Sequence, residues 1–318
     1  MSDSPVVSVV VPVHNARATL GLALSSLQQQ SWQSWEALLV DDGSTDCGLA
    51  LAEALGDPRV RVVRQPQRGA AAARNTGLRH AVGNYVAFLD ADDFLFPSYL
   101  GENLRLLRRS AARTIITNNA YFLTLDGINP RLVRHRYSFP SRLAAQQDAI
   151  LASNFVSIMS VFPRALLTDV PEFDESLERA EDWDYWIRAS YAGWHFIHQR
   201  KPLAFINRTQ HSLTTATSQV AAAERAILVK SAGTLPLSGR QHTAIARRLS
   251  TGEPSWLLLE SDDLVKQRRY SAAARKHWAA TRMTRPSWPG IFRSLIFRAA
   301  PSLVGRWIRR TQGRLNQH

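Results

Sequence analysis

The stretch YVAFLDADDFLFP (Tyr85–Pro97) runs from a short apolar segment directly into three closely spaced carboxylates. The apolar residues Tyr85–Leu89 have the length and composition of a buried β-strand. Asp90, Asp92 and Asp93 follow, with apolar residues on both sides of them. Like charges at this spacing repel, and buried carboxylates need a cation or hydrogen-bond donors. An Asp-x-Asp pair at the end of a strand suits a hard divalent cation that also binds substrate phosphates.

Strand-like and helix-like segments alternate over the first 220 residues. Leucines recur at helical spacing after the first apolar run, and an alanine-rich helix is expected over Ala70–His80. This alternation indicates an α/β fold, a Rossmann-like, mostly parallel sheet with helices on both faces. Such sheets bind ligands at the carboxyl ends of their strands. The expected strands are the apolar runs Val6–Pro12, Trp35–Asp42, Val60–Val63 and Tyr85–Leu89.

Polar residues come directly after three of these strands. PVHN (Pro12–Asn15) ends the first, DDGSTD (Asp41–Asp46) ends the second and DADD (Asp90–Asp93) ends the fourth. Taken alone, DDGSTD is typical of a turn with a helix cap. The pair HN alone is also weak evidence for a binding site. Because the carboxyl ends of parallel strands lie at one edge of a sheet, the three segments together predict a single binding site.

Motif order and spacing give the chain a family resemblance. The three segments above, together with AAARNTG (residues 71–77) and AEDWDYW (residues 180–186), resemble the family 2 glycosyltransferases of the GT-A fold over roughly residues 5–215. The resemblance implies an inverting enzyme that moves a sugar from a nucleotide diphosphate sugar, expected to be a UDP-sugar, to an acceptor hydroxyl. The acceptor would be a saccharide or a lipid-linked molecule in cell-surface polysaccharide or glycolipid synthesis.

The resemblance also implies a nucleotide and metal site. Asp42, with Asp41 beside it, would accept a hydrogen bond from the base, and the Arg74 guanidinium would neutralise phosphate charge. Asp92 would ligate Mg²⁺ or Mn²⁺, and Asp90 would contact the ribose or reach the metal through water. The ion would stabilise charge on the leaving diphosphate. The alternative for Arg74 is a plain surface residue of a helix. The expected nucleotide-binding residues are Pro12, His14, Asn15, Asp41, Asp42, Arg74 and Asp90.

The polar loop INRTQHSLT (Ile206–Thr214) supplies two further candidates. The resemblance implies that His211 is a third metal ligand or a phosphate contact, and that Arg208 lies at the acceptor or diphosphate site. A single histidine in a polar loop is equally compatible with an ordinary surface residue. Both interpretations of this loop stay open on the sequence alone.

The segment RAEDWDYWIRA (residues 179–189) holds three acids, Glu181, Asp182 and Asp184. An attacking hydroxyl must lose a proton, and a carboxylate within hydrogen-bond reach can take it. The resemblance implies Asp182 as this general base, with Glu181 and Trp183 at the acceptor or diphosphate site. Adjacent acids and tryptophans would raise the pKa of one carboxyl by like charge and burial. The alternative is an acidic first turn that stabilises a helix through its dipole.

The net charge of +13 belongs to one part of the chain. Residues 1–220 contain 21 Lys and Arg against 21 Asp and Glu, so the whole excess lies in residues 221–318. We therefore predict a GT-A domain over 1–220 and a basic helical region over 221–318. Two other classes are considered. The positive charge is confined to residues 221–318 and no nucleic-acid-binding motif is present, which argues against a nucleic-acid-binding protein. All the acidic residues expected of an active enzyme are present, which argues against an inactive nucleotide-sugar-binding regulator.

Cysteine content and the N-terminal sequence predict a cytoplasmic location. Cys47 is the only cysteine, as expected in a reducing compartment. The start of the chain lacks the basic-then-apolar pattern of a signal peptide, and no apolar stretch approaches the ~18 residues of a spanning helix. The protein is therefore expected in the cytoplasm, either free or peripheral on the inner face of the cell membrane.

Two C-terminal segments have helical spacing. Ser261–Pro286 resembles one tetratricopeptide-like hairpin. Gly290–Arg314 mixes apolar residues with arginines, a pattern typical of segments that lie at the surface of an anionic membrane. Pro301 would divide this segment into two helices. A helix pair packed on the protein with a solvated basic face is the alternative.

We expect the intact chain to co-sediment with anionic vesicles and to be released as salt rises, since each Lys or Arg near such a surface contributes about 1 kcal/mol. Replacing Phe292, Ile296 and Trp307 with Ser should weaken this binding at unchanged net charge. A chain that ends near Pro286 should stay in the supernatant. If the intact chain ignores anionic vesicles at low salt, the packed helix pair is the correct interpretation.

Overall fold

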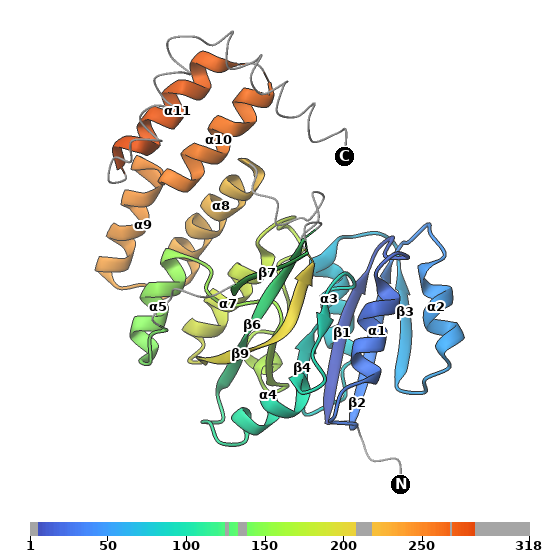
Figure 1. Cartoon of the computed structure of the whole chain (residues 1–318). Helices are drawn as coiled ribbons and strands as arrows, with labels where there is room; N and C mark the ends of the chain where they lie inside the picture. Colours follow the sequence, from blue (N-terminus) through green and yellow to red (C-terminus); the bar gives the residue numbers. More distant parts are fainter. Residues whose placement is uncertain (1–5, 125–126, 133–138, 208–217, 268, 284–318) are drawn as a thin grey trace. The chain divides into compact units, whose positions relative to one another are not determined.

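The computed structural model describes residues 6–124, 127–132, 139–207, 218–267 and 269–283. The chain divides into two compact units, Met1–Ser212 and Leu213–His318. The first is built around a β-sheet and the second from helices (Figure 1). The boundary predicted at residues 220 and 221 falls inside helix α8 (Ser218–Thr234), so the helical unit begins earlier in the chain.

One mixed sheet forms the centre of the first unit. Its parallel half holds the four predicted strands, whose ends agree with the prediction to within two residues. Beyond the fourth of them the pairing becomes antiparallel. It is parallel again between β6 (Thr114–Thr124) and β9 (His195–Asn207), and the sheet ends in short antiparallel pairs. The strand order is β3 (Val60–Gln65), β2 (Trp35–Asp42), β1 (Val7–Val13), β4 (Tyr85–Phe88), β8 (Ser160–Pro163), β6 (Thr114–Thr124), β9 (His195–Asn207) and β5 (Phe94–Leu95), with β7 (Gly127–Leu132) paired to β6.

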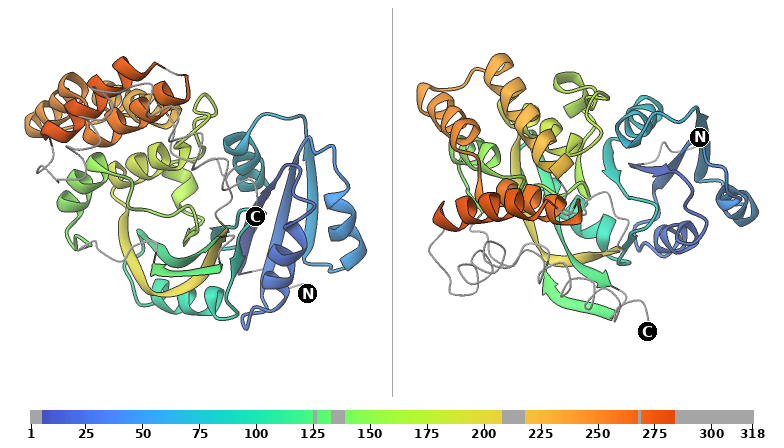
Figure 2. Two further views of the ribbon diagram at one scale, coloured as in Figure 1. Left: turned by 45° about the horizontal axis from the view of Figure 1, so that its top comes forward. Right: turned by 90° about the horizontal axis from the view of Figure 1, so that it is seen from above.

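Helices cover both faces of the parallel half, as predicted (Figure 2). On one face, Val9 and Val11 of β1 join a core with leucines of α1 (Leu20–Gln28). Val10 points the other way and meets α3 (Ala70–His80), as the two-residue period of a strand requires. The other described helices of this unit are α2 (Gly48–Leu55), α4 (Tyr99–Leu107), α5 (Leu143–Ala152), α6 (Leu166–Asp169) and α7 (Glu181–Tyr191).

The described part of the second unit is helical, which confirms the predicted helical region. α10 (Pro254–Lys266) and α11 (Tyr270–Met283) form a hairpin that overlaps the segment Ser261–Pro286 predicted to resemble one. The Ser261 hydroxyl donates to the Ala273 carbonyl oxygen across it (3.0 Å). Trp256 is fully buried, and its indole N–H donates to Glu224. The helices are α8, α9 (Gly239–Thr251), α10 (Pro254–Lys266) and α11 (Tyr270–Met283).

The predicted membrane-surface segment Gly290–Arg314 lies outside the described residues. Over the residues that are described, no helix combines the length and the apolar character needed to cross a membrane.

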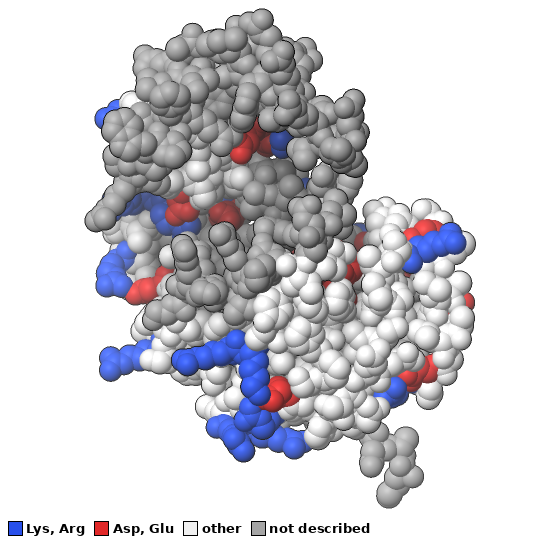
Figure 3. Space-filling view, in the orientation of Figure 1, with Lys and Arg blue, Asp and Glu red and all other residues white. Residues whose placement is uncertain are grey.

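Lys and Arg side chains gather at the end of the first unit where α4 lies (Figure 3). Some of this charge is paired within the protein, because Arg105 and Lys201 form ion pairs with Glu102 at 2.6 and 2.8 Å. Such exposed pairs contribute little to stability. Because two cations share one carboxylate, this end of the unit keeps an excess of positive charge although residues 1–220 carry equal numbers of basic and acidic residues.

Gly77 sets how closely α3 packs against the sheet. A Cβ atom built at this position would lie 2.2 Å from Cγ1 of Val10, closer than any two carbon atoms that are not bonded can approach. Only glycine permits this contact. The close packing places Arg74, one helical turn earlier, at the carboxyl ends of β1 and β4, where Asp90 lies.

We expect Gly77→Ala to lower the free energy of unfolding by about 1–3 kcal/mol, the usual effect of an extra methyl group in a packed core. Gly21→Ala is the matched control, because a Cβ at Gly21 in α1 would lie 4.0 Å from Cδ1 of Leu51, an ordinary van der Waals contact. That change should leave stability unchanged or raise it by up to ~1 kcal/mol. Urea unfolding of the two variants measures both, and equal stability would contradict the role given to Gly77.

Candidate functional site

The ends of β1 and β2 meet at the predicted edge of the sheet. Val13 of β1 pairs in register with Asp41 of β2. Just beyond, Nδ1 of His14 lies 2.9 Å from the carbonyl oxygen of Asp42. A carbonyl oxygen can only accept, so Nδ1 carries the proton in this contact. His14 and Asp42, both predicted to belong to the site, are therefore neighbours.

Asn15 organises the turn that follows β2. Its backbone adopts the left-handed conformation (φ 50°), which asparagine tolerates better than most residues. Its side-chain oxygen accepts hydrogen bonds from the backbone N–H groups of Thr45 (2.8 Å) and Asp46 (3.3 Å). Asp41 accepts from the Ser44 N–H within the same turn (2.9 Å). In this structure Asn15 and Asp41 thus shape the loop, and their contact with a nucleotide stays a prediction.

Asp42 is buried and holds the loop that precedes α3. Its carboxylate accepts three hydrogen bonds of 2.8 Å, from the Gln65 side chain and from the backbone N–H groups of Arg68 and Gly69. α3 begins at a glycine with no side-chain cap of its own, and a carboxylate near the N-terminus of a helix is favoured by the helix dipole. Asp42 was not predicted to have this role; the absence of a cap residue in QRGAAAARN is the sequence signal that indicates it.

Arg74 links two parts of the site that are far apart in sequence. Its side chain is 6% exposed, with one Nη 2.9 Å from Oδ1 of Asp90 and the other 2.5 Å from Oε1 of Glu181. Burial by itself would lower the pKa of this guanidinium, but the charges of Asp90 and Glu181 more than offset it and raise the pKa. The alternative that Arg74 is a plain surface residue is therefore wrong.

The three carboxylates after β4 have different surroundings. Asp93 is buried and accepts a hydrogen bond from the Asn207 N–H (2.9 Å), and burial with the charges of Asp90 and Asp92 raises its pKa well above the ordinary value. Burial, together with the charge of Asp90, also raises the pKa of Asp92. Asp93 therefore anchors the end of β9, while Asp90 and Asp92 stay partly exposed.

A divalent cation fits the pair that remains. Asp92 is partly buried and lies close to the charge of Asp90. Within the described residues, Asp90 forms an ion pair with Arg74, and no such pair is formed by Asp92 or Asp93. Among those residues, no three His, Cys, Asp or Glu side chains converge as a complete metal site. Mg²⁺ and Mn²⁺ do not need one, since one or two carboxylates with substrate phosphates and water complete their coordination.

Asp182 lies in the first turn of α7 beside this network. Asn154 donates a hydrogen bond to its Oδ2 atom (3.0 Å). Burial and the charge of Glu181 raise the pKa of Asp182 to about 6, although Arg74 and Asn154 act in the opposite direction. A carboxyl with a pKa near neutrality is suited to proton transfer. Arg74 is thus paired with Asp90 of the acidic loop and with Glu181, and the candidate base Asp182 is the next residue after Glu181.

Two other residues of this helix have roles in the interior. Trp183 is 2% exposed, and its indole N–H donates to the Ile150 carbonyl oxygen (2.7 Å), so its ring packs in the core and not along the wall of a site. Asp184 is also buried and forms an ion pair with Arg188 (2.8 Å). His211 and Arg208 lie outside the described residues.

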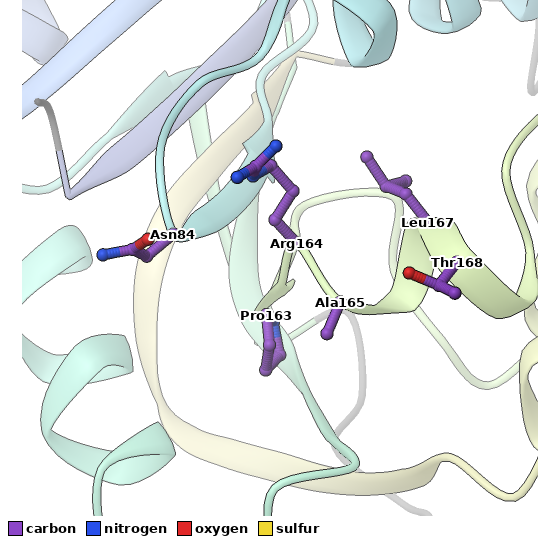
Figure 4. Close-up of a pocket in the computed structure, with 6 residues that line it drawn as sticks. All are labelled: Asn84, Pro163, Arg164, Ala165, Leu167 and Thr168. Carbon is purple, nitrogen blue, oxygen red and sulfur yellow. The ribbon is translucent and has the colours of Figure 1, made fainter.

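A surface pocket of about 520 Å³ lies elsewhere in the first unit (Figure 4). Its lining includes Asn84, which directly precedes β4, and Pro163, the last residue of β8. β8 runs antiparallel to β4. Both residues therefore mark the edge of the sheet opposite to the one at which Asp90 follows β4, and the pocket is not part of the site.

Comparison with known proteins identifies the class. The family described as glycosyl transferase family 2 matches residues 8–170, about half of the chain. The protein belongs to this family.

Characterised and uncharacterised relatives agree with this assignment. The glucosyltransferase WfgD of Escherichia coli, described as UDP-Glc:alpha-D-GlcNAc-diphosphoundecaprenol beta-1,3-glucosyltransferase, is 33% identical over 58% of this chain and 70% of its own. The amylovoran biosynthesis glycosyltransferase AmsB of Erwinia amylovora is 29% identical over 67% and 71%. An uncharacterised glycosyltransferase of Haemophilus influenzae is 37% identical over 41% of this chain, and the match spans about half of that protein (53%).

Solved structures share the fold. TarS of S. aureus (residues 1–349, in complex with UDP-GlcNAc) superimposes with a TM-score of 0.63 at 20% identity, covering 86% of this chain and 81% of its own. The mannosyltransferase PcManGT of Pyrobaculum calidifontis, in complex with GDP-Man and Mn²⁺, has a TM-score of 0.60 at 17% identity, covering 96% and 84%. The predicted GT-A fold with a helical C-terminal region is confirmed.

The raised pKa of Asp182 predicts a pH-dependent stability. A carboxyl with a pKa of about 6 when folded, against 3.8 as the ordinary value, binds its proton more tightly in the folded state. Its contribution to stability is thus fully present below about pH 4 and is lost as the pH rises through about 6. Asp182→Asn removes this dependence. The variant should gain about 1–3 kcal/mol relative to the parent protein between about pH 4 and about pH 8, measured by urea unfolding. A difference that does not change with pH would contradict the raised pKa.

Proposed function

We propose that this chain is an inverting glycosyltransferase that moves a sugar from a UDP-sugar to an acceptor hydroxyl. The observation that carries the proposal is the Arg74 bridge, because it holds the acidic loop after β4 and the candidate base Asp182 in one network. The names of relatives support the class of reaction: WfgD carries UDP-Glc in its description, and TarS was solved with UDP-GlcNAc.

On the donor side, we assign Asp90, Asp92 and Arg74 to the diphosphate. A Mg²⁺ or Mn²⁺ ion held by Asp92, and by Asp90 directly or through water, would neutralise charge on the leaving group. Arg74 would add a guanidinium that is already held in place by Asp90 and Glu181. Burial, and after it the charge of Asp90, raise the pKa of Asp92, and a bound cation would offset both effects.

On the acceptor side, we assign Asp182 as general base in a single displacement. The acceptor hydroxyl oxygen attacks the anomeric carbon from the side opposite to the diphosphate, and its proton passes to the Asp182 carboxylate. The new carbon–oxygen bond forms as the bond to the diphosphate breaks, and the nucleoside diphosphate leaves with the electron pair. The configuration at the anomeric carbon is therefore inverted. A carboxyl with a pKa of about 6 is ionised at pH 7 and still basic enough for this role.

The acceptor we propose is a saccharide or a lipid-linked molecule. WfgD is described as acting on a diphosphoundecaprenol-linked sugar, and AmsB is assigned to the biosynthesis of amylovoran. By analogy with these relatives, we propose that this chain acts in cell-surface polysaccharide synthesis. The alternative class, a regulator that binds nucleotide sugars without reacting, would use the same donor-side residues. Metal-dependent transfer or hydrolysis of a nucleotide sugar excludes it.

Two substitutions should separate binding from chemistry. Asp92→Asn removes one charge from the cation site, so Mn²⁺-dependent binding of UDP and turnover should both be lost. Asp182→Asn should leave UDP-sugar affinity nearly unchanged while turnover falls by ~10² or more, since a general base acts in the transition state. Calorimetry with UDP and Mn²⁺ measures the first effect, and a sugar-transfer assay over a panel of UDP-sugars measures the second.

Asp184→Asn is the control, because Asp184 lies in the same helical turn as Asp182 but is paired with Arg188. It should retain turnover. Unchanged UDP binding in Asp92→Asn would remove the metal assignment. Full turnover in Asp182→Asn would remove the base, and absence of turnover in the parent protein over the whole panel would favour the regulator.

A further inference from the structure

Two hydrogen bonds to other described residues fix which way the Asn154 side-chain amide faces. Its Oδ1 atom accepts from the backbone N–H of Val156 (3.1 Å), and its Nδ2 atom donates to Oδ2 of Asp182 (3.0 Å). A backbone N–H can only donate, so the amide oxygen must face Val156 and the amide NH₂ must face Asp182. Rotating the amide by half a turn would place two donors against each other at Val156 and two acceptors against each other at Asp182.

The backbone around Asn154 is tied to the helix that carries Asp182. Asn154 follows the end of α5, and α5 is joined to α7 by two further hydrogen bonds. The Trp183 indole N–H donates to Ile150 (2.7 Å), and the Gln147 side chain donates to the Ser190 carbonyl oxygen (3.1 Å). Asn154 is therefore held at a defined distance from Asp182 by the packing of these two helices.

Asn154 and the backbone N–H of Trp183 are the neutral groups among the described residues that act on Asp182, and Asn154 is the one that acts through its side chain. The charged groups that act on Asp182 within the described residues are Glu181, from the same helix, and Arg74, from α3. A neutral N–H donor stabilises an ionised carboxylate without forming an ion pair, whereas a cation in its place would lower the basicity much further.

We propose that Asn154 is the positioning residue of the general base, orienting the Asp182 carboxylate toward the acceptor hydroxyl and favouring its ionised form. This inference rests on the proposed function and extends it to a residue with no reactive group of its own. Asn154 acts through Asp182, with no contact of its own to the reacting atoms.

The test uses the full chain with three substitutions. Asn154→Ala removes the donor. Asn154→Asp keeps the shape and an acceptor for the Val156 N–H, but it places a second carboxyl against Asp182. Gln147→Ala is the control, because it removes a hydrogen bond between the same two helices without touching Asp182. The readouts are the pH profile of kcat, the KM for the UDP-sugar, and the carbon NMR titration of Asp182 without substrate, assigned by its absence in Asp182→Asn.

We expect Asn154→Ala to lower kcat by ~10-fold or more with KM for the donor changed less than about twofold. The acidic limb of its profile should move upward by ~1 pH unit, since a hydrogen bond to the ionised form is lost. Asn154→Asp should move it further by like-charge repulsion. Gln147→Ala should keep the profile of the parent protein.

Two results would overturn the inference: an acidic limb and an Asp182 titration that are unchanged in Asn154→Ala, or an equal shift in Gln147→Ala, which would show a merely structural effect. The parent protein provides the separate check on the proposed function. If it transfers no sugar, the proposed function fails, and the NMR titration still decides whether Asn154 governs the ionisation of Asp182.

Discussion

A buried guanidinium between two carboxylates is the interaction on which the site depends. Arg74 is almost fully removed from water, and its partners Asp90 and Glu181 come from a loop after β4 and from the start of α7. Removing one partner of such a buried pair typically costs about 3–5 kcal/mol, because the remaining charge is left without compensation. The exposure of the Asp90 side chain (30%) reduces that cost here. The ion pairs of Arg74 therefore contribute more to the relative position of Asp90 and Glu181 than to stability. They hold the proposed donor and acceptor sides of the site next to each other.

The neighbouring loops are also held by side chains that come from other segments of the chain. α3 has no cap residue of its own, and Asp42 from the adjacent strand accepts the N–H groups that precede it. Asn15 accepts from the turn after β2 in a similar way. Because each loop is held by a side chain from another segment, the edge of the sheet has its shape before any ligand binds. Such pre-organisation reduces the ordering cost that binding has to overcome.

Much of the fold was predictable because the strands and helices of its parallel half have local sequence patterns that indicate them. The runs that became β1, β2, β3 and β4 are apolar, short and bounded by turn residues, and α3 begins and ends within the expected range. The mixed half was not predictable in the same way. β6 pairs parallel with β9, some eighty residues later in the chain, with register shifts that no local pattern announces.

The candidate site was predictable in its composition and less so in its contacts. Asp90, Arg74, Glu181 and Asp182 were expected and do lie together. The burial of Trp183 was missed, since an indole at that position can face a ligand or the core with the same local sequence. Asn154 was missed because its partner is distant in the chain, and a single asparagine in a loop carries no signal.

The change from parallel to antiparallel pairing at β4 bears on how such a chain can diversify. The residues assigned to the nucleotide belong to β1 and the loop after it, β2, α3 and the loop after β4, all in the parallel half. The segments between β6 and α7, by contrast, connect strands of the mixed half through a hairpin and short helices. Insertions there can reshape the surface near Asp182 while leaving the packing of β1 against α3 untouched. The sheet thus separates the half to which the nucleotide is assigned from the half whose connecting segments lie near Asp182.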